Sequence, residues 1–426
     1  MYTRVSLLLL VFLQLLASGC KKEKDDQKPL IEIILPGSSA TLHVPDTLVV
    51  RVNVSDDEMV KNVWFTLGDA NGGVIAQSGT VEVNAMSATV ERMIIVNDAS
   101  ITSGTYTLSV RANDGTNTST AFRSVNVSEE ELRLRAIFIT SPSGSIIKID
   151  SVGTQSIFST FNEISEADIN SFTQQLFIAT GFFDPLQVLT ASDQGNNWQL
   201  PNTNPQSTPY FTAIHTDESD DRTYVCTNEG YIRGYTSSGI PQFTAQALSG
   251  FRPYQGVVAG DRYISEQHAI ALNEKRLVNY TYANGSLLEQ FALDLDVIAM
   301  FPASDQLLVF GNRNGDGVIQ SRNITQGGIY EMQLFSGEEI IAVDLISPST
   351  YVVAKTDQVV RFQYTNNSIV PLMNAPVTDI AYEKAGGAVL VGLDQQIQVI
   401  DPMNGNLVNT IGLPDPIGKI LPLFNR

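Results

Sequence analysis

Residues 30–127 are built from short segments in which hydrophobic and polar positions alternate, with turn residues between the segments. The segments TLVVRVNVSDDE, KNVWFTLGD, ATVERMIIV and GTYTLSVRANDG are rich in Val, Ile, Thr and Tyr. A period of two with these residue types is typical of half-buried β-strands. Roughly seven such strands in about 100 residues favour a β-sandwich. We therefore predict a sandwich domain over residues 30–128.

Beyond Glu129–Glu131 the pattern becomes a repeat. Short hydrophobic strands (LFIAT, TYVCT, RYIS, LLVFG, TYVVA and AVLVG) recur, at a spacing of roughly 42 residues. Each follows a shorter hydrophobic strand and precedes a third strand that leads into a turn with Gly or Asn. The equivalent positions are Phe177, Tyr224, Tyr263, Leu308, Tyr351 and Val389. Four strands per repeat predict the blades of a β-propeller, because a lone four-stranded sheet cannot bury its faces.

The two ends of this region complete one another. IGKILPLFNR at the C-terminus has the pattern of a first strand without followers, and RAIFITSPSGSIIKIDSVGTQSIFSTF has that of three strands without a first one. Joining them in one sheet removes exposed strand edges. We predict that residues 134–426 form a seven-bladed propeller, in which Ile417–Leu421 pairs with Ala136–Thr140.

Two resemblances support this all-β architecture. The strand GTYTL, followed by Val110, resembles the tyrosine-corner strand of immunoglobulin-like bacterial domains, and Trp64 then corresponds to the core tryptophan of a central strand. Such a domain serves as a stalk in lipoproteins. IQVIDPMNGNLVNTI resembles the blades of quinoprotein-like, YVTN-type bacterial propellers. The tryptophan motifs of quinone-dependent dehydrogenases are missing, since Trp64 and Trp198 are the only tryptophans, and no cofactor is implied.

The N-terminus predicts export and anchoring. Arg4 precedes a hydrophobic run, Val5–Ala17, which is shorter than the about 20 residues that span a bilayer. LASGC resembles the lipobox of bacterial lipoproteins, although leucine is more usual at the position of Ala17. The resemblance implies a signal peptide over residues 1–19 and a lipid bilayer as the partner of acylated Cys20. Ordinary secretion and a buried structural cysteine are the alternatives.

Residues 20–29 form a tether of mixed charge, KKEKDDQK, that is too polar to fold. Acidic residues soon after the lipidated cysteine resemble the signal by which some gram-negative bacteria export lipoproteins to the outer face of the outer membrane. We therefore expect a bacterial outer-membrane protein that is lipid-anchored and exposed at the cell surface.

Charge and cysteine content exclude several functions. The 426 residues carry a net charge of −19 and show no basic stripe, so nucleic acid is not an expected partner. Apart from Cys20, the only cysteine is Cys226, and the chain cannot form an internal disulfide after lipidation. Cys226 lies in the strand pattern TYVCT, where we expect a small buried hydrophobic residue.

Motifs for catalysis and metal binding are sparse. The histidines His43, His215 and His268 lie far apart, and no HExxH, GxSxG or glycine-rich phosphate loop occurs. His215 ends an innermost strand near the central channel, where it is either a ligand or base, or a capped residue at the rim. Two groups of residues are candidate Ca²⁺ sites, although turn formation explains both equally well. The first group is Asp56, Asp57, Glu58 and Asp114. The second is Asn312, Asn314, Asp316 and Gly317, which follow the spacing of a calcium-binding loop, but the twelfth position of that loop is Asn323 instead of glutamate.

One face of the propeller is the candidate binding face, because loops carry many binding residues. The loops between second and third strands carry one acid in each of six blades: Asp184, Glu229, Glu266, Asp316, Asp357 and Asp394. The same face gathers aromatic residues and an arginine: Tyr210, Phe251, Arg252 and Tyr254 in blade-linking loops, with Phe182, Phe183 and Tyr231. The alternative is that the acids form turns and the aromatics pack between blades.

Two functions remain open at this point. The first is a membrane-anchored binding or scaffold protein whose propeller loops bind a protein or a glycan. The second is a glycan-active hydrolase or lyase, which needs two carboxylates about 5–10 Å apart at the channel mouth. The absence of a compact catalytic motif favours binding.

Overall fold

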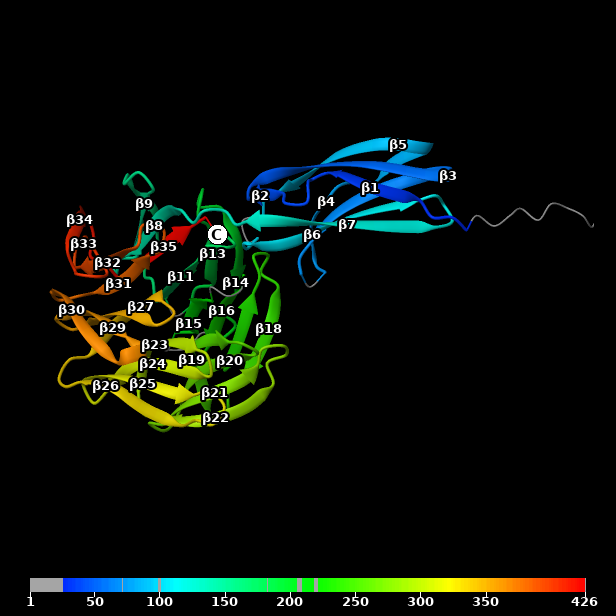
Figure 1. The fold of residues 1–426 in the computed structure, drawn as a ribbon. Helices are drawn as coiled ribbons and strands as arrows, with labels where there is room; N and C mark the ends of the chain where they lie inside the picture. The colour runs from blue at the N-terminus through cyan, green and yellow to red at the C-terminus, as the bar shows by residue number, and fades with distance from the viewer. Residues whose placement is uncertain are drawn as a thin grey trace, which may run out of the picture. The chain divides into compact units, whose positions relative to one another are not determined.

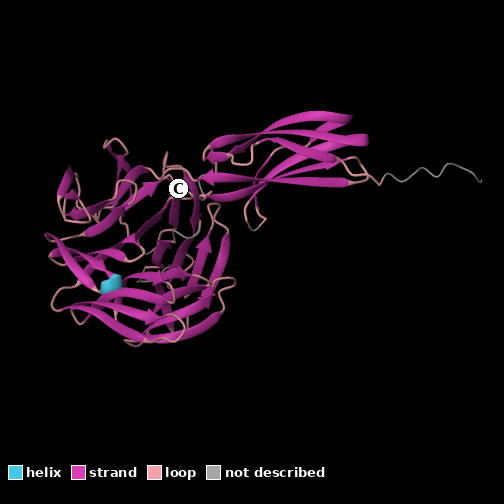
Figure 2. Cartoon of the chain, in the orientation of Figure 1, coloured by secondary structure: helices cyan, strands magenta, loops and turns pink. Residues whose placement is uncertain are grey.

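The computed structural model describes residues 26–70, 72–98, 101–181, 183–204, 209–217 and 221–425. The predicted signal peptide and the predicted lipidation site, Cys20, lie outside these residues. The chain forms two compact units, residues 1–131 and 132–426. Nearly all regular structure is β (Figure 2), and the described residues contain one helical turn, the 3₁₀ helix η1 (Tyr364–Asn366). The predicted all-β fold is confirmed.

The N-terminal unit is a sandwich of seven strands, in which β3 pairs with four others. The strands are β1 (Leu30–Leu35), β2 (Thr41–His43), β3 (Asp46–Gly68), β4 (Val74–Gln77), β5 (Val81–Val96), β6 (Gly104–Asn113) and β7 (Thr118–Ser128). The first half of β3 pairs with β1, its second half pairs with β4 and β6, and β5 pairs with parts of both halves. β3 therefore pairs directly with four of the other six strands.

The core of this unit follows the alternation along each strand. Tyr106 donates a hydrogen bond from its hydroxyl to the carbonyl of Thr102, at 2.9 Å, as a tyrosine corner does. The prediction for Trp64 is wrong. Along β3 the inward positions hold Val63, Phe65 and Leu67, all fully buried, so the neighbouring Trp64 faces outward, and the guanidinium of Arg111 lies 5.2 Å from its ring centre.

The C-terminal unit is a ring of seven four-stranded sheets (Figure 1). From the innermost strand outward, the blades are β35 (Lys419–Phe424), β8 (Leu134–Thr140), β9 (Ser145–Asp150), β10 (Gln155–Thr160); β11 (Glu166–Asn170), β12 (Gln175–Ala179), β13 (Leu186–Thr190), β14 (Asn196–Leu200); β15 (Phe211–Thr216), β16 (Thr223–Thr227), β17 (Tyr231–Tyr235), β18 (Pro241–Gln246); and β19 (Phe251–Ala259), β20 (Arg262–Ala269), β21 (Lys275–Thr281), β22 (Leu287–Leu293).

The remaining three blades are β23 (Asp296–Ala303), β24 (Gln306–Arg313), β25 (Asp316–Asn323), β26 (Ile329–Phe335); β27 (Ile340–Ser347), β28 (Thr350–Lys355), β29 (Gln358–Gln363), β30 (Ser368–Asn374); and β31 (Asp379–Glu383), β32 (Ala388–Leu393), β33 (Gln396–Ile400), β34 (Leu407–Gly412). We call the innermost strand of each blade its first strand.

The last strand of the chain closes the ring. β35 pairs antiparallel with β8, and its register joins Lys419 to Thr140, Ile420 to Ile139 and Leu421 to Phe138. This is the pairing that the two incomplete sequence ends predicted. The ring therefore has no open seam between its first and last blades.

The second strands form the hydrophobic layers between blades. The six equivalent positions of the repeat all lie in second strands and are at most 1% exposed: Phe177, Tyr224, Tyr263, Leu308, Tyr351 and Val389. Both faces of a second strand touch neighbouring blades, so its sequence reads as a continuous hydrophobic run rather than an alternating one. The repeat was recognisable because of these runs.

Candidate functional site

The seven first strands surround a central channel. A cavity of about 810 Å³ runs through it, and residues from every first strand line its wall. Polar side chains project into this cavity from several blades: Glu166, Asp168, Gln255, Asp344, Asp379 and Lys419. Acids outnumber bases in its lining, with four carboxylates against the two lysines Lys384 and Lys419.

Three of the channel carboxylates connect neighbouring blades. Asp168 on β11 accepts a hydrogen bond from the backbone N–H of Thr216 at 2.7 Å. Asp344 on β27 accepts one from Tyr382 at 2.6 Å, and Asp379 on β31 accepts one from Ile420 at 2.6 Å. Each bond joins a first strand to the first strand of the next blade. These carboxylates therefore hold the ring together, in addition to lining the channel.

Lys419 adds a fourth connection between neighbouring blades. Its ammonium group donates to the carbonyl of Ala167 at 2.8 Å and so joins β35 to β11. Burial lowers the pKa of Lys419, but the carboxylates of Asp168, Glu166 and Asp379 outweigh that effect and raise it overall. Lys419 is therefore charged at neutral pH, and it offsets only part of the acidic charge around it.

Burial has the opposite effect on the acids. It raises the pKa of Glu166 and Asp168 above the usual range, although the nearby Lys419 opposes the rise. It raises the pKa of Asp379 to about 7. A charge held away from water is costly when the surrounding opposite charge is insufficient. The channel thus keeps acids whose charge is only partly compensated.

A second cavity opens beside the first on the candidate binding face. It measures about 320 Å³ and is lined by β11, β15, β19, β20, β23 and Lys419. We call it the mouth pocket. Its wall carries Tyr254, whose ring stacks on the imidazole of His268 with centroids 4.2 Å apart. The imidazole contacts the carboxylate of Glu266 at 2.7 Å between Nε2 and Oε1.

Glu266 is held rigidly in this arrangement. Glu266 is only 2% exposed, and its Oε1 also accepts a hydrogen bond from the backbone N–H of Val297 at 3.3 Å. The bulge in β19 between Pro253 and Gly256 turns Tyr254 toward the pocket. At Gly256 a Cβ atom would lie 2.1 Å from the hydroxyl oxygen of Tyr263, so only glycine allows this close approach.

The structure corrects the location of several predicted residues. Glu266 lies within strand β20 and not in the loop that follows. Phe251, Arg252 and Tyr254 lie within β19 rather than in a blade-linking loop. The reason is that Phe251–Pro253 pairs in register with Gln267–Ala269, which extends both strands beyond the hydrophobic run. Asp316 and Tyr231 are likewise the first residues of strands, β25 and β17.

Other predicted residues of the face take part in local packing. Tyr210 is 3% exposed, and its hydroxyl donates to the carboxylate of Glu229 at 3.1 Å. The guanidinium of Arg233 lies 4.4 Å from the ring centre of Tyr231. Phe183 is 68% exposed in the loop that also holds Asp184. Phe182 lies outside the described residues.

His215 and Cys226 have structural surroundings. The imidazole of His215 stacks on Tyr224 and Tyr263 with centroids 5.2 and 5.8 Å apart, and its Nε2 lies 3.0 Å from the Tyr263 hydroxyl. Burial lowers the pKa of His215 to about 3, so the ring is neutral. Cys226 is fully buried, as predicted, and burial raises the pKa of its thiol to about 12.

The two predicted calcium loops are organised by their own hydrogen bonds. Asp56 accepts the backbone N–H groups of Glu58 and Met59, and Asp114 accepts those of Thr116 and Asn117. In the propeller loop, Asn312 bonds both backbone groups of Ile340, and Asp316 accepts the N–H of Gly337. Across the described residues, no three His, Cys, Asp or Glu side chains lie close enough to hold a metal ion.

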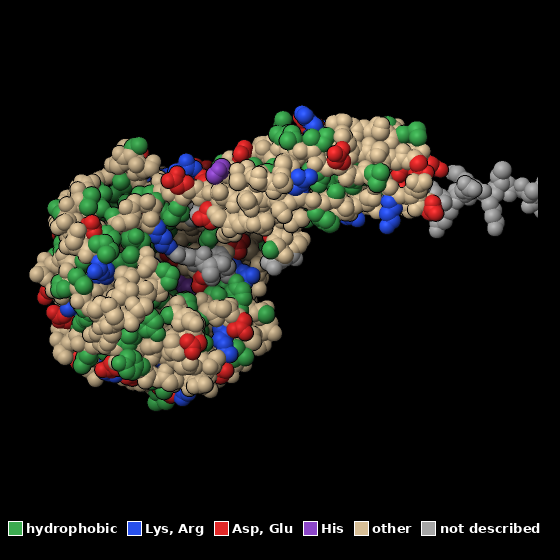
Figure 3. All heavy atoms as spheres, in the orientation of Figure 1, with side chains coloured by type: hydrophobic (Ala, Val, Ile, Leu, Met, Phe, Trp, Pro, Cys, Tyr) green, Lys and Arg blue, Asp and Glu red, His purple; other side chains and the backbone are tan. Residues whose placement is uncertain are grey.

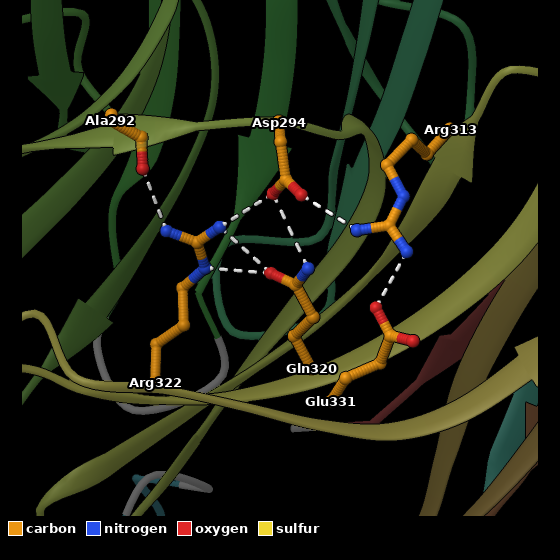
Figure 4. Close-up of polar contacts among 6 residues, drawn as sticks. All are labelled: Ala292, Asp294, Arg313, Gln320, Arg322 and Glu331. Carbon is orange, nitrogen blue, oxygen red and sulfur yellow. Dashed lines mark hydrogen bonds and ion pairs between the residues drawn. The ribbon is translucent and has the colours of Figure 1, made fainter.

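A charged network joins the blade of β23–β26 to the end of β22 (Figure 4). Asp294 accepts bonds from Arg313 at 2.8 Å, Arg322 at 3.0 Å and Gln320 at 3.3 Å. Arg313 also pairs with Glu331 at 2.6 Å. The hydrogen bonds from these donors outweigh burial and hold the pKa of Asp294 below its usual range. Both guanidinium groups are therefore committed to carboxylates within the fold.

Sequence reasoning missed the carboxylates that connect the blades and the pair of Tyr254 with His268. The connecting acids do carry a signal, since an acid interrupts the hydrophobic first strands in EADIN and AVDLI. The stacked pair has none. Tyr254 and His268 come together only because β19 and β20 pair in one register.

On the face drawn in Figure 3, acidic, basic and hydrophobic side chains are interspersed over the propeller. Among the described residues, none of the helical structure is long and hydrophobic enough to cross a bilayer.

Comparison with known proteins agrees with the two-part architecture. Residues 29–121 match the family model of the bacterial Ig domain. The N-terminal region is Ig-like. A comparison with curated protein sequences gave no match.

Solved structures share the propeller fold at low identity. BamB from Moraxella catarrhalis is 14% identical with a TM-score of 0.43, and the match covers 67% of this chain and 89% of that one. A quinoprotein alcohol dehydrogenase-like protein from Bacteroides thetaiotaomicron is 12% identical with a TM-score of 0.48, covering 93% and 99% of the two chains. At this identity and these TM-scores, the matches carry no conclusion about function.

Proposed function

We propose that this protein is a lipid-anchored binding module at the surface of the bacterial outer membrane, and that its propeller binds a protein or glycan partner. One observation carries the proposal. The mouth pocket and the channel share lining residues and together form a concave site with polar and hydrophobic walls drawn from all seven blades. Concave sites with a few convergent polar groups are where ligands bind.

The test compares partner capture by matched variants. Ala342 lines the channel on β27, and Ala342→Trp fills part of the cavity without changing charge. Thr410→Trp adds the same side chain on the exposed outer strand β34 and is the control. Tagged protein in intact cells is cross-linked, and its partners are identified by mass spectrometry. We expect Ala342→Trp alone to lose a partner that the wild type captures. Equal capture by both variants would exclude the channel as the binding site.

The anchor is tested separately. Cys20→Ser removes the thioether that would carry the lipid, so we expect the protein to leave the membrane fraction and appear in the soluble one. Surface display predicts that protease added to whole cells degrades the wild-type protein. A wild-type protein that resists protease on intact cells but not in lysates would contradict display at the outer face.

A glycan-active enzyme is the second candidate, and the raised pKa of Glu166 is the observation that favours it. A general acid needs such a carboxyl group. Against this candidate, both carboxylate oxygens of Asp168 accept hydrogen bonds from backbone N–H groups, those of Thr216 and Ile169, so Asp168 is not available as the second catalytic carboxylate. Release of reducing ends from an oligosaccharide by the wild type, and its loss in Glu166→Gln, would establish the enzyme.

A further inference from the structure

The mouth pocket differs from the rest of the channel in carrying an aromatic wall. Tyr254 and His268 both line the pocket, and their rings stack with centroids 4.2 Å apart. Glu266 fixes that imidazole through the 2.7 Å contact, and β23 in turn fixes Glu266 through Val297. A ring held in this way presents a hydrophobic surface without a further loss of side-chain freedom on binding.

Other residues that line the pocket supply acceptors and a donor. Glu166 lines the pocket, and its carboxyl group lies close enough to the ammonium group of Lys419 to interact with it electrostatically. Gln255 donates its amide N–H to the carbonyl of Val297 at 3.3 Å, which leaves its own carbonyl oxygen as an acceptor. Lys419 also lines the pocket; its ammonium group donates one hydrogen bond to the carbonyl of Ala167 and has further N–H groups to donate.

The charge of the pocket limits the ligand. Glu166, Asp168, Glu266 and Asp296 line it, and Lys419 is its one lysine, so an anionic ligand would be repelled. A volume of about 320 Å³ lies at the lower end of the range for small-molecule sites, about 300–1,000 Å³. It suits a small group or the end of a chain rather than a folded protein surface.

From this combination we infer that the mouth pocket binds one sugar unit of a neutral saccharide, with its C–H face on Tyr254 and its hydroxyl groups on Glu166, Gln255 and Lys419. A pyranose ring has one apolar face of C–H groups and a rim of hydroxyls that both donate and accept. It therefore matches a pocket lined by one aromatic surface together with carboxylate, amide and ammonium groups. The inference rests on the proposed function, because it names the ligand of the same binding face.

The test uses an array of neutral oligosaccharides built from glucose, galactose, mannose or xylose, with the full chain purified from membranes in detergent. Affinity for any oligosaccharide that binds is then measured by calorimetry. We expect Tyr254→Ala to weaken binding at least tenfold and Tyr254→Phe to retain it, because the ring supplies the contact. Tyr330→Ala removes a 64% exposed tyrosine from the outer strand β26 and is expected to leave affinity unchanged.

Glu166→Gln provides a second arm that does not disturb the ring. It removes the charge and keeps the shape, so we expect a several-fold loss of affinity together with an unchanged melting temperature. Saturation-transfer NMR on the wild type should mark the C–H protons of one sugar unit, and Tyr254→Ala should abolish this signal.

The outcomes separate this inference from the proposed function. If no neutral oligosaccharide binds, or if Tyr254→Ala binds as tightly as Tyr330→Ala, the saccharide site is wrong. Binding of spermidine in place of saccharides would also overturn it, since that result would assign the acids to a cation. In either case a partner protein whose capture depends on Ala342 would leave the proposed function intact.

Discussion

Asp294 illustrates how single charged residues act in this protein. Arg322 is 3% exposed and depends on Asp294 and Gln320 for its side-chain partners, whereas the carboxylate of Asp294 is 47% exposed (Figure 4). Breaking a pair from one side leaves the other charge buried without a partner, which costs more than the pair contributes. Asp294, the exposed partner of the buried Arg322, is therefore the residue to mutate.

Asp294→Asn should lower the free energy of unfolding by about 1–3 kcal/mol at pH 7. Because the folded-state pKa of Asp294 lies below the unfolded value, its contribution is complete above the unfolded value and is lost as the pH falls through the folded one. The difference between variant and wild type should therefore shrink in acid. Urea unfolding at pH 7 and pH 3 measures this difference, and Asp357→Asn, a substitution of an exposed turn residue, is the control. An equal difference at both pH values would contradict the mechanism.

Asp379 shows the reverse dependence. Its folded-state pKa of about 7 lies above the unfolded value, so the unfolded chain releases this proton first as the pH rises. Wild-type stability should fall between about pH 4 and pH 7, by at most about 4 kcal/mol from this group. Asp379→Asn keeps an acceptor for the N–H of Ile420 and should flatten that fall.

The measurement is chemical denaturation at unit pH steps from 4 to 8. Asp261→Asn makes the same charge change on a side chain that is 94% exposed, and it should leave the slope unchanged. If the stability of Asp379→Asn depends on pH as strongly as that of the wild type, other channel acids cause the dependence and the prediction for Asp379 is wrong.

At the scale of elements, β35 carries the closure of the ring. It contributes the first strand of its blade, pairs with β8, and places Ile420, Leu421 and Leu423 in the core at 3–4% exposure. Removing it would expose the inner edge of β8 and the hydrophobic side chains beneath it.

A chain ending at residue 418 should therefore lose the cooperative unfolding of the propeller and aggregate on purification. Loss of four buried side chains of β35, each costing about 1.5–3 kcal/mol, is comparable to the usual stability of a whole domain. Adding a synthetic peptide with the sequence GKILPLFNR should restore part of the soluble protein. Cooperative unfolding of the truncated chain at the wild-type temperature would show that closure is not needed.

The pairing of elements also explains how much of the site could be foreseen. The loops of one face were expected to gather binding residues, and Tyr254 and Glu266 do line a pocket there. Their placement within β19 and β20 was not foreseen, because strand ends depend on register and a bulge. A hydrophobic pattern locates the middle of a strand but not its ends.

At the scale of the whole molecule, the two units have separate hydrophobic cores. The buried cluster of the sandwich extends from Ile33 to Val127 along the chain, and the clusters of the propeller begin at Ala136. Domains with their own cores are expected to unfold as separate units.

We therefore expect two transitions in calorimetry of the full chain. Val63→Ala removes a fully buried side chain from the sandwich and should lower one transition temperature alone. Val353→Ala, fully buried in the propeller, should lower the other. A single transition that both variants shift equally would show that the units unfold as one.

The sequence by itself determined the order of the two domains, the β-propeller repeat and the pairing of the last strand with the first. These features follow from hydrophobic patterns that are local or that recur at a constant spacing. Only the tertiary structure decided that Trp64 faces outward, that Tyr210 is buried, and that Tyr254, Glu266 and His268 share one pocket with Lys419. Those contacts join residues far apart in the chain through strand register and ring closure, and a pattern of hydrophobic positions carries no record of which distant side chains meet.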